Sequence, residues 1–167
     1  MNPAEICTTI LGPEKLAGVI EELSAPQIKA VLKEGSVRVK LPGGYVSQQK
    51  RRKLWSTKIL AAIDRGNDSL CGELLQQWLL NHRRQMLIDY LDRLEIKHRD
   101  GETDESFLVT CPVERARDAA SWLMDRHDRR ETLAYLHYIA HQQRSTVFDE
   151  WDDAAPAPTA AAGQPEP

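Results

Sequence analysis

The sequence lacks the short motifs that identify many enzymes and nucleotide-binding proteins. It contains no GxSxG nucleophile elbow, no P-loop and no GxGxxG dinucleotide fingerprint. The glycine-rich residues 42–44 are followed by neither the lysine nor the Ser or Thr that a phosphate cradle requires. We therefore expect a non-enzymatic protein without a cofactor.

Cysteine is scarce, and no paired spacing relates Cys7, Cys71 and Cys111. An odd number of widely separated cysteines excludes a zinc ribbon or a CxxC redox motif and indicates reduced thiols in a cytoplasmic protein. The first twelve residues have no basic region ahead of their short apolar run, so we expect no signal peptide. No apolar run approaches the roughly 20 residues of a membrane span, which predicts no membrane partner.

What the sequence does contain is typical of a globular domain. Of its 167 residues 41% are hydrophobic and 28% charged, with a formal net charge of −3. This balance gives no overall bias toward nucleic acid or anionic membrane, so any basic binding site must be local. We predict one helical domain over residues 1–151 and a disordered Pro/Ala-rich tail over residues 152–167.

Apolar periodicity predicts an all-α fold, an antiparallel multi-helix bundle. Residues 70–94 carry the longest run of three- and four-residue apolar spacings and should supply core helix. Helix starts are marked by side chains suited to N-capping, several of them in capping boxes, with a Pro at the first helical position in residues 111–114. The predicted caps are Asn2, Ser24, Ser47, either Asn67 or Asp68, and Asp128.

Residues 36–46 depart from the helical period. Val37, Val39 and Leu41 alternate with Arg38 and Lys40, as in a strand, and a turn at residues 42–44 follows. Two interpretations remain open, a small hairpin closed by residues 45–46 and an extended loop packed on the helices.

Part of the central segment recurs further along the chain. The sequence WLLNHRR at residues 78–84 resembles WLMDRHDRR at residues 122–130, and a Leu and a Tyr-Leu pair follow each. Each copy predicts a helix, a tight turn near the His and a second helix that starts at the Arg pair. Residues 70–94 would then form a helical hairpin broken near Asn81 and His82, and the fold would contain two related hairpins. The alternative is a chance similarity between two Leu- and Arg-rich helices.

Basic residues cluster around the start of the helix predicted over residues 47–65. The cluster comprises Arg38, Lys40, Lys50, Arg51, Arg52, Lys53 and Lys58. Cations in a first helical turn oppose the helix dipole at a cost of roughly 0.3 to 1 kcal/mol each, which suggests a function for them. Two Arg pairs, Arg83 with Arg84 and Arg129 with Arg130, mark the second helices of the predicted hairpins and could add to an anion-binding face.

Each candidate site has a structural alternative. The cations could instead cover apolar surface and pair with neighbouring carboxylates such as Asp64, Asp89, Asp125 and Glu131. Trp151, in the sequence FDEWDD, is either an exposed anchor for a partner or part of a segment that docks on the bundle. His137 and His141 have metal-ligand spacing, but ordinary packing is favoured because no Glu follows His137.

These observations favour a protein-interaction or regulatory module, an adaptor or complex subunit. It would bind a protein partner or a second copy through the basic helix start, the acidic residues 100–105, or both. The alternative is a nucleic-acid-binding protein that uses the same basic residues.

Overall fold

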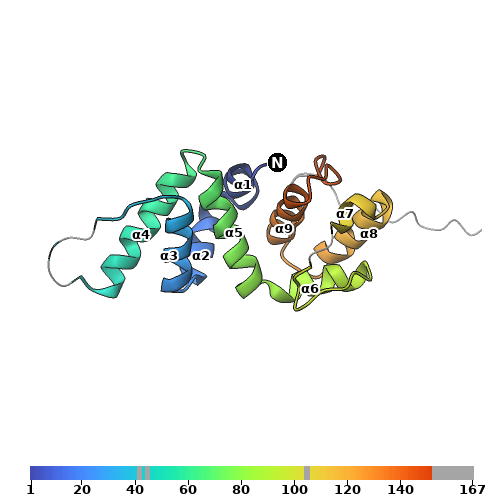
Figure 1. The fold of residues 1–167 in the computed structure, drawn as a ribbon, viewed down its shortest axis with the longest axis horizontal. Helices are drawn as coiled ribbons and strands as arrows, with labels where there is room; N and C mark the ends of the chain where they lie inside the picture. The colour runs from blue at the N-terminus through green and yellow to red at the C-terminus, as the bar shows by residue number, and fades with distance from the viewer. Residues whose placement is uncertain (41–42, 44–45, 104–105, 152–167) are drawn as a thin grey trace, which may run out of the picture.

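The structure is a computed structural model that describes residues 1–40, 43, 46–103 and 106–151. The all-α class is confirmed, and the described part contains no β-strand. In chain order the elements are α1 (Pro3–Glu5), the π-helical η1 (Ile6–Leu11), α2 (Gly12–Glu22), α3 (Ala25–Glu34), α4 (Gln48–Ile63), α5 (Asp68–His82), α6 (Arg84–Arg93), α7 (Phe107–Thr110), α8 (Val113–Met124) and α9 (Arg129–Gln142). Figure 1 shows an elongated molecule with α4 at one end, α7 and α8 toward the other, and α5 between them.

All five predicted N-caps are confirmed, and Asn67 rather than Asp68 is the cap of α5. The side chains of Asn2, Ser24, Ser47, Asn67 and Asp128 each accept a hydrogen bond from a backbone N–H of the first helical turn. The first two form complete capping boxes, whereas the Glu131 carboxylate binds Arg83 and Lys15. The start of α8 is shifted by one residue, because Pro112 is its N-cap.

The hairpin alternative for residues 36–46 is wrong over the part that the structure describes. Residues 37–40 are not a strand, since no second strand pairs with them. The Val37 N–H instead donates to the Leu32 carbonyl at 2.8 Å, which closes the end of α3. Val37 and Val39 are half-buried against the helical core, so the extended-loop alternative is the correct one there. The turn predicted at residues 42–44 and its continuation at Tyr45 lie largely outside the described residues.

The predicted break in the central segment is confirmed, because α5 ends at His82 and α6 begins at Arg84. The second copy has the same break between α8 and α9. The packing of the two copies differs: α8 packs against α9, whereas α6 turns away from α5 and packs beside α8 (Figure 1). The similar sequences thus both contain a helix break, but the connection is one residue between α5 and α6 and residues 125–128 between α8 and α9.

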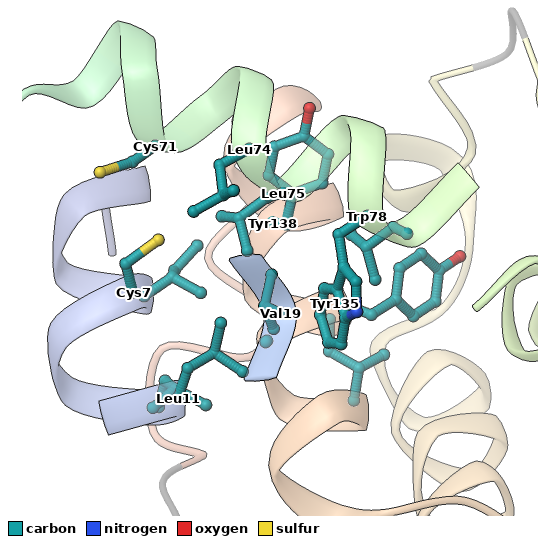
Figure 2. Close-up of a cluster of buried hydrophobic side chains, with 14 of the residues drawn as sticks. Cys7, Leu11, Val19, Cys71, Leu74, Leu75, Trp78, Tyr135 and Tyr138 are labelled. Carbon is teal, nitrogen blue, oxygen red and sulfur yellow. The ribbon is translucent and has the colours of Figure 1, made fainter. Parts of the chain in front are cut away.

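Helix α5 lies at the centre of the core. Its buried side chains Cys71, Leu74, Leu75 and Trp78 face η1, α2 and α9 (Figure 2). The buried apolar residues from Ala4 to Phe148 belong to one cluster. Burial of this continuous apolar surface is the main force that holds the short helices together.

The last described residues dock on the bundle. Val147 and Phe148 are buried, and the Trp151 ring packs on the Phe148 ring with centroids 5.6 Å apart. The Nε2 atom of His137 lies 2.6 Å from the backbone oxygen of Trp151. These contacts favour the intramolecular interpretation of this segment. The predicted tail, residues 152–167, lies outside the described residues.

Candidate interaction surface on α3 and α4

Charge is distributed unevenly along the chain. Residues 24–66 contain ten Lys and Arg and two acidic residues, a net charge of +8. The other residues contain twelve Lys and Arg and twenty-three acidic residues, a net charge of −11. Because α3 and α4 lie together at one end of the molecule (Figure 1), we call residues 24–66 the basic end.

The structure of α4 explains which cations of the basic end face solvent. Trp55, Ile59, Ala62 and Ile63 are buried, which fixes one face of the helix against the core. No acidic residue occurs in α4. The exposed predicted site residues of this end are Arg38, Lys40, Lys50, Lys53 and Lys58.

The start of α4 lacks the capping box found in α1 and α3, as does the start of α5, where Leu70 holds the same position. The Ser47 hydroxyl accepts a hydrogen bond from the Lys50 N–H at 3.4 Å, as an N-cap should. At the third helical position, α1 and α3 carry Glu5 and Gln27, whose side chains bind back to the cap. In α4 this position is Lys50, which cannot accept such a bond and opposes the helix dipole. Lys50 therefore makes the start of α4 less stable than a glutamate or glutamine at the same position would make it.

Arg52 has a structural role. Its Nη2 atom contacts the carbonyl oxygens of Glu21 and of Leu23, the latter at 2.6 Å, at the C-terminal end of α2. A cation at this end of a helix is favourable because unpaired carbonyls carry partial negative charge there. The neighbouring Arg51 is half-buried, and its Nε atom is buried without a hydrogen-bond partner.

The cations of the basic end are not neutralised by carboxylates. Among the described residues, no ion pair includes a Lys or Arg of residues 24–66. The alternative in which carboxylates pair with the cations is therefore not found at this end within the part of the chain that the structure describes. An exposed, uncompensated basic surface attracts anionic groups and speeds the association of anionic partners.

The Arg pairs that were predicted to join this surface are placed elsewhere. Arg83 binds Glu131 and Glu22, and Arg84 donates to the Leu80 carbonyl and lies 3.8 Å from Asp100. Arg129 and Arg130 also have interaction partners. Whether these four arginines bind a partner stays a prediction, but their charges are used at least partly within the molecule.

Arg83 is the centre of an ionic cluster that joins distant helices. Its guanidinium makes two hydrogen bonds to the Glu131 carboxylate and one to Glu22, and it lies 5.0 Å from the centroid of the Trp78 ring. Lys15 reaches Glu131 at 2.9 Å and Asp128 at 3.1 Å. These side chains line a cleft of about 450 Å³ in which both signs of charge are present, so it is not an anion site.

The cluster shifts the pKa of its carboxylates. Burial is the largest single influence on Glu131 and raises its pKa, but the hydrogen bonds and charges of Arg83 and Lys15 outweigh burial. The pKa of Glu131 therefore lies below its ordinary value, and the pKa of Asp128 is lowered in the same way. Both groups act as fixed negative charges at neutral pH.

No metal centre is found in the described part of the chain. No group of three or more His, Cys, Asp or Glu side chains is arranged there to hold a metal ion. His137 is buried. No helix among the described residues is long and apolar enough to cross a bilayer.

Sequence reasoning found the cations of α4 and named Glu131 among the carboxylates that could pair with cations, but it did not predict the pairing of Arg83 with Glu131 or the ionic cluster. Arg83 and Glu131 are 48 residues apart, and nothing in their local sequences pairs them. Sequence reasoning also missed the +8 charge of residues 24–66, which a count over a longer window would have revealed. Comparisons with protein-family models, curated proteins and solved structures find no match for this chain.

Proposed function

We propose that this protein is a non-enzymatic interaction module that binds an acidic surface of a partner protein through its basic end. The observation that carries the proposal is the set of five exposed cations, Arg38, Lys40, Lys50, Lys53 and Lys58, which form no ion pair with a carboxylate of the described residues. The lysine in place of a capping acid at position 50 supports it, because departures from local rules concentrate at functional sites.

The charge of the remaining chain favours a protein over a nucleic acid. A long polyanion that crosses the basic end would also meet the net −11 of the other residues and be repelled. Among the described residues of the basic end, Trp55 is the one Trp, Tyr or Phe, and it is buried, so no aromatic side chain is available there for base stacking. A compact acidic patch on a protein can instead dock on this end alone.

The test uses two variants with equal net charge. The basic-end variant carries Lys50→Glu, Lys53→Glu and Lys58→Glu, and the control variant carries Lys97→Glu, Arg99→Glu and Arg144→Glu, three exposed cations outside the basic end. Binding of a fluorescent poly-glutamate peptide and of a 20-base-pair DNA is measured by anisotropy at low and high salt. We expect the wild type and the control variant to bind the peptide at low salt and the basic-end variant to lose binding.

The basic-end variant is designed so that unfolding cannot explain lost binding. Glu at position 50 would complete the Ser47 capping box, and acids in the first turn complement the helix dipole. Its melting temperature should therefore equal or exceed that of the wild type. Failure of the wild-type protein to bind the peptide at low salt would contradict the proposal. Tighter binding of DNA than of peptide, abolished by the same substitutions, would establish the nucleic-acid alternative instead.

A further inference from the structure

A second cleft lies on the opposite side of α5 from the basic end and is chemically different from it. It has a volume of about 370 Å³ and is bordered by α5, α6, α9, residues 101–103 and Ser106. That volume is within the range of small-molecule sites. Its apolar lining consists of Leu79, Leu80, Leu87, Leu91 and Ile139.

The polar lining of this cleft is almost entirely neutral. It includes the tyrosines Tyr135 and Tyr138 and the amides of Gln76, Gln142 and Gln143. Glu102 is the one charged residue of the lining, and it is exposed. A cleft without a cation does not compensate the desolvation of an anionic ligand, and the exposed carboxylate of Glu102 compensates that of a cationic ligand only weakly, so this composition favours an uncharged ligand.

The hydroxyl of Tyr135 is the group that points to a ligand. The residue is only 3% exposed and lines the cleft, and its hydroxyl makes no hydrogen bond to another described residue. A hydroxyl that faces a cleft without a protein partner can donate to a ligand oxygen in place of water. Burial raises the pKa of Tyr135, which keeps the hydroxyl protonated and available as a donor at neutral pH.

The surroundings of Tyr135 hold its ring in one place. The ring packs edge-on against the Tyr90 ring, with centroids 5.6 Å apart and an interplanar angle of 85°. On the rim of the cleft, Gln143 is fixed because its Oε1 atom accepts a hydrogen bond from the Leu108 N–H at 2.8 Å. Such preorganised polar groups reduce the entropy lost when a ligand binds.

We infer that this cleft binds a small uncharged molecule with an apolar body and an acceptor oxygen that takes the Tyr135 hydrogen bond. The leucines and Ile139 would enclose the apolar body, and the glutamine amides would contact its polar end. This inference concerns residues outside the basic end and does not depend on the proposed function.

The test compares two probes of similar shape, benzamide and benzoate, in NMR titrations of the full ¹⁵N-labelled chain. We expect benzamide to give saturable shifts at the cleft residues with a Kd on the order of millimolar, as for other ligands of this size. Benzoate should give none there, because the lining supplies no cation. Absence of saturable benzamide shifts, or equal shifts with benzoate, would overturn the inference.

Two tyrosine variants distinguish the contribution of the Tyr135 hydroxyl to binding from that of the general shape of the cleft. Tyr135→Phe should weaken benzamide binding about three- to tenfold, the effect of one neutral hydrogen bond. Tyr90→Phe is the matched control: its hydroxyl contacts the Ala116 carbonyl at 3.4 Å, and the residue does not line the cleft. It should leave the affinity unchanged. If a folded Tyr135→Phe protein bound benzamide with unchanged affinity, the Tyr135 hydroxyl would not be part of the binding site.

Discussion

Gly35 marks the closest approach of α3 to α5. A Cβ atom built at this position would lie 2.6 Å from the Cβ of Leu70 and 2.8 Å from its Cδ1. The Leu70 Cβ is attached directly to the backbone of α5, so a side chain at position 35 would push two packed helices apart. The φ angle of Gly35 is −72°, which any residue adopts, and the need for glycine is therefore one of space.

We predict that Gly35→Ala lowers the free energy of unfolding by about 1–3 kcal/mol, the usual cost of overpacking a core. The control is Gly18→Ala in α2, where an added Cβ meets no atom within 4 Å. This second change should raise stability by about 0.5–1 kcal/mol, because alanine is the better helix former. Urea unfolding measures both, and equal stabilities of the two variants would refute the close approach.

Asn67 connects the same two helices by hydrogen bonds. Its Oδ1 atom accepts from the Leu70 N–H at 3.0 Å, and its Nδ2 atom donates to the Gly35 carbonyl at 3.0 Å. The sequence predicts the first bond, since Asn is a preferred N-cap. The second bond depends on the tertiary contact at Gly35 and cannot be inferred from local sequence.

Substitutions at position 67 should distinguish the contributions of these two hydrogen bonds to stability. Asn67→Asp keeps the capping oxygen but replaces the donor to Gly35 with a second acceptor, and we predict a loss of about 1 kcal/mol. Asn67→Ala removes both bonds and should cost more, about 1–3 kcal/mol. Thermal unfolding of the three proteins at pH 7 gives the order. An Asp variant as stable as the wild type would mean that the bond to Gly35 contributes nothing.

At the level of helices, the Arg83 cluster joins α2, the junction of α5 with α6, and α9. The Glu131 carboxylate forms ion pairs with Arg83, which lies at the junction, and with Lys15 of α2. Only 10% of the Glu131 side chain is exposed. Local periodicity and capping predicted each of these helices, because those signals lie within a few residues of one another. The ion pairs that orient the helices lie far apart in sequence, which is why sequence reasoning assigned Arg83 to a binding face.

We predict that Glu131→Gln lowers the free energy of unfolding by about 1–3 kcal/mol at pH 7, because Arg83 and Lys15 lose their shared carboxylate. The matched control is Glu14→Gln, an exposed carboxylate on the same cleft, which should change stability by less than about 0.5 kcal/mol. Guanidinium chloride is unsuitable because it screens charges, so urea titrations are the measurement. Equal effects of the two substitutions would contradict a structural role for the cluster.

The same variant should change the pH dependence of stability. The pKa of Glu131 is lowered from its ordinary value of 4.5, so the folded state favours the ionised carboxylate. That contribution is complete above the unfolded pKa and is lost as pH falls through the folded pKa. The stability difference between wild type and Glu131→Gln should thus be constant near neutrality and shrink below about pH 4.5. A difference that stays constant down to pH 2.5 would show that the charge of Glu131 is not responsible.

At the scale of the whole molecule, charge separation follows from the order of helices along the axis. The sequence identified the cations near Lys50, but the position of α3 beside α4 at one end depends on packing around α5 (Figure 1). Local patterns do not encode that arrangement, since buried apolar contacts between distant segments determine it. The result is an electrostatically asymmetric molecule whose net charge conceals a strongly basic end.

This asymmetry predicts how the protein behaves on charged surfaces. With a net charge of −3, a uniformly charged protein would pass through a sulfonate cation exchanger at pH 7. We expect this chain to be retained at low salt, because the basic end can face the resin and the Debye length of about 30 Å at 0.01 M lets several cations act together. Retention should weaken steeply as salt rises.

The two charge-reversed variants determine whether retention depends on the basic end or on total charge. Each lowers the net charge from −3 to −9, since reversing one cation changes it by two. Substitution of Lys50, Lys53 and Lys58 should abolish retention on the sulfonate resin, whereas substitution of Lys97, Arg99 and Arg144 should preserve most of it. Equal loss in both variants would mean that net charge governs binding and that the cations of α4 form no distinct surface. Loss confined to the first variant would locate the attractive field at α4, which is the requirement for a docking site at that end.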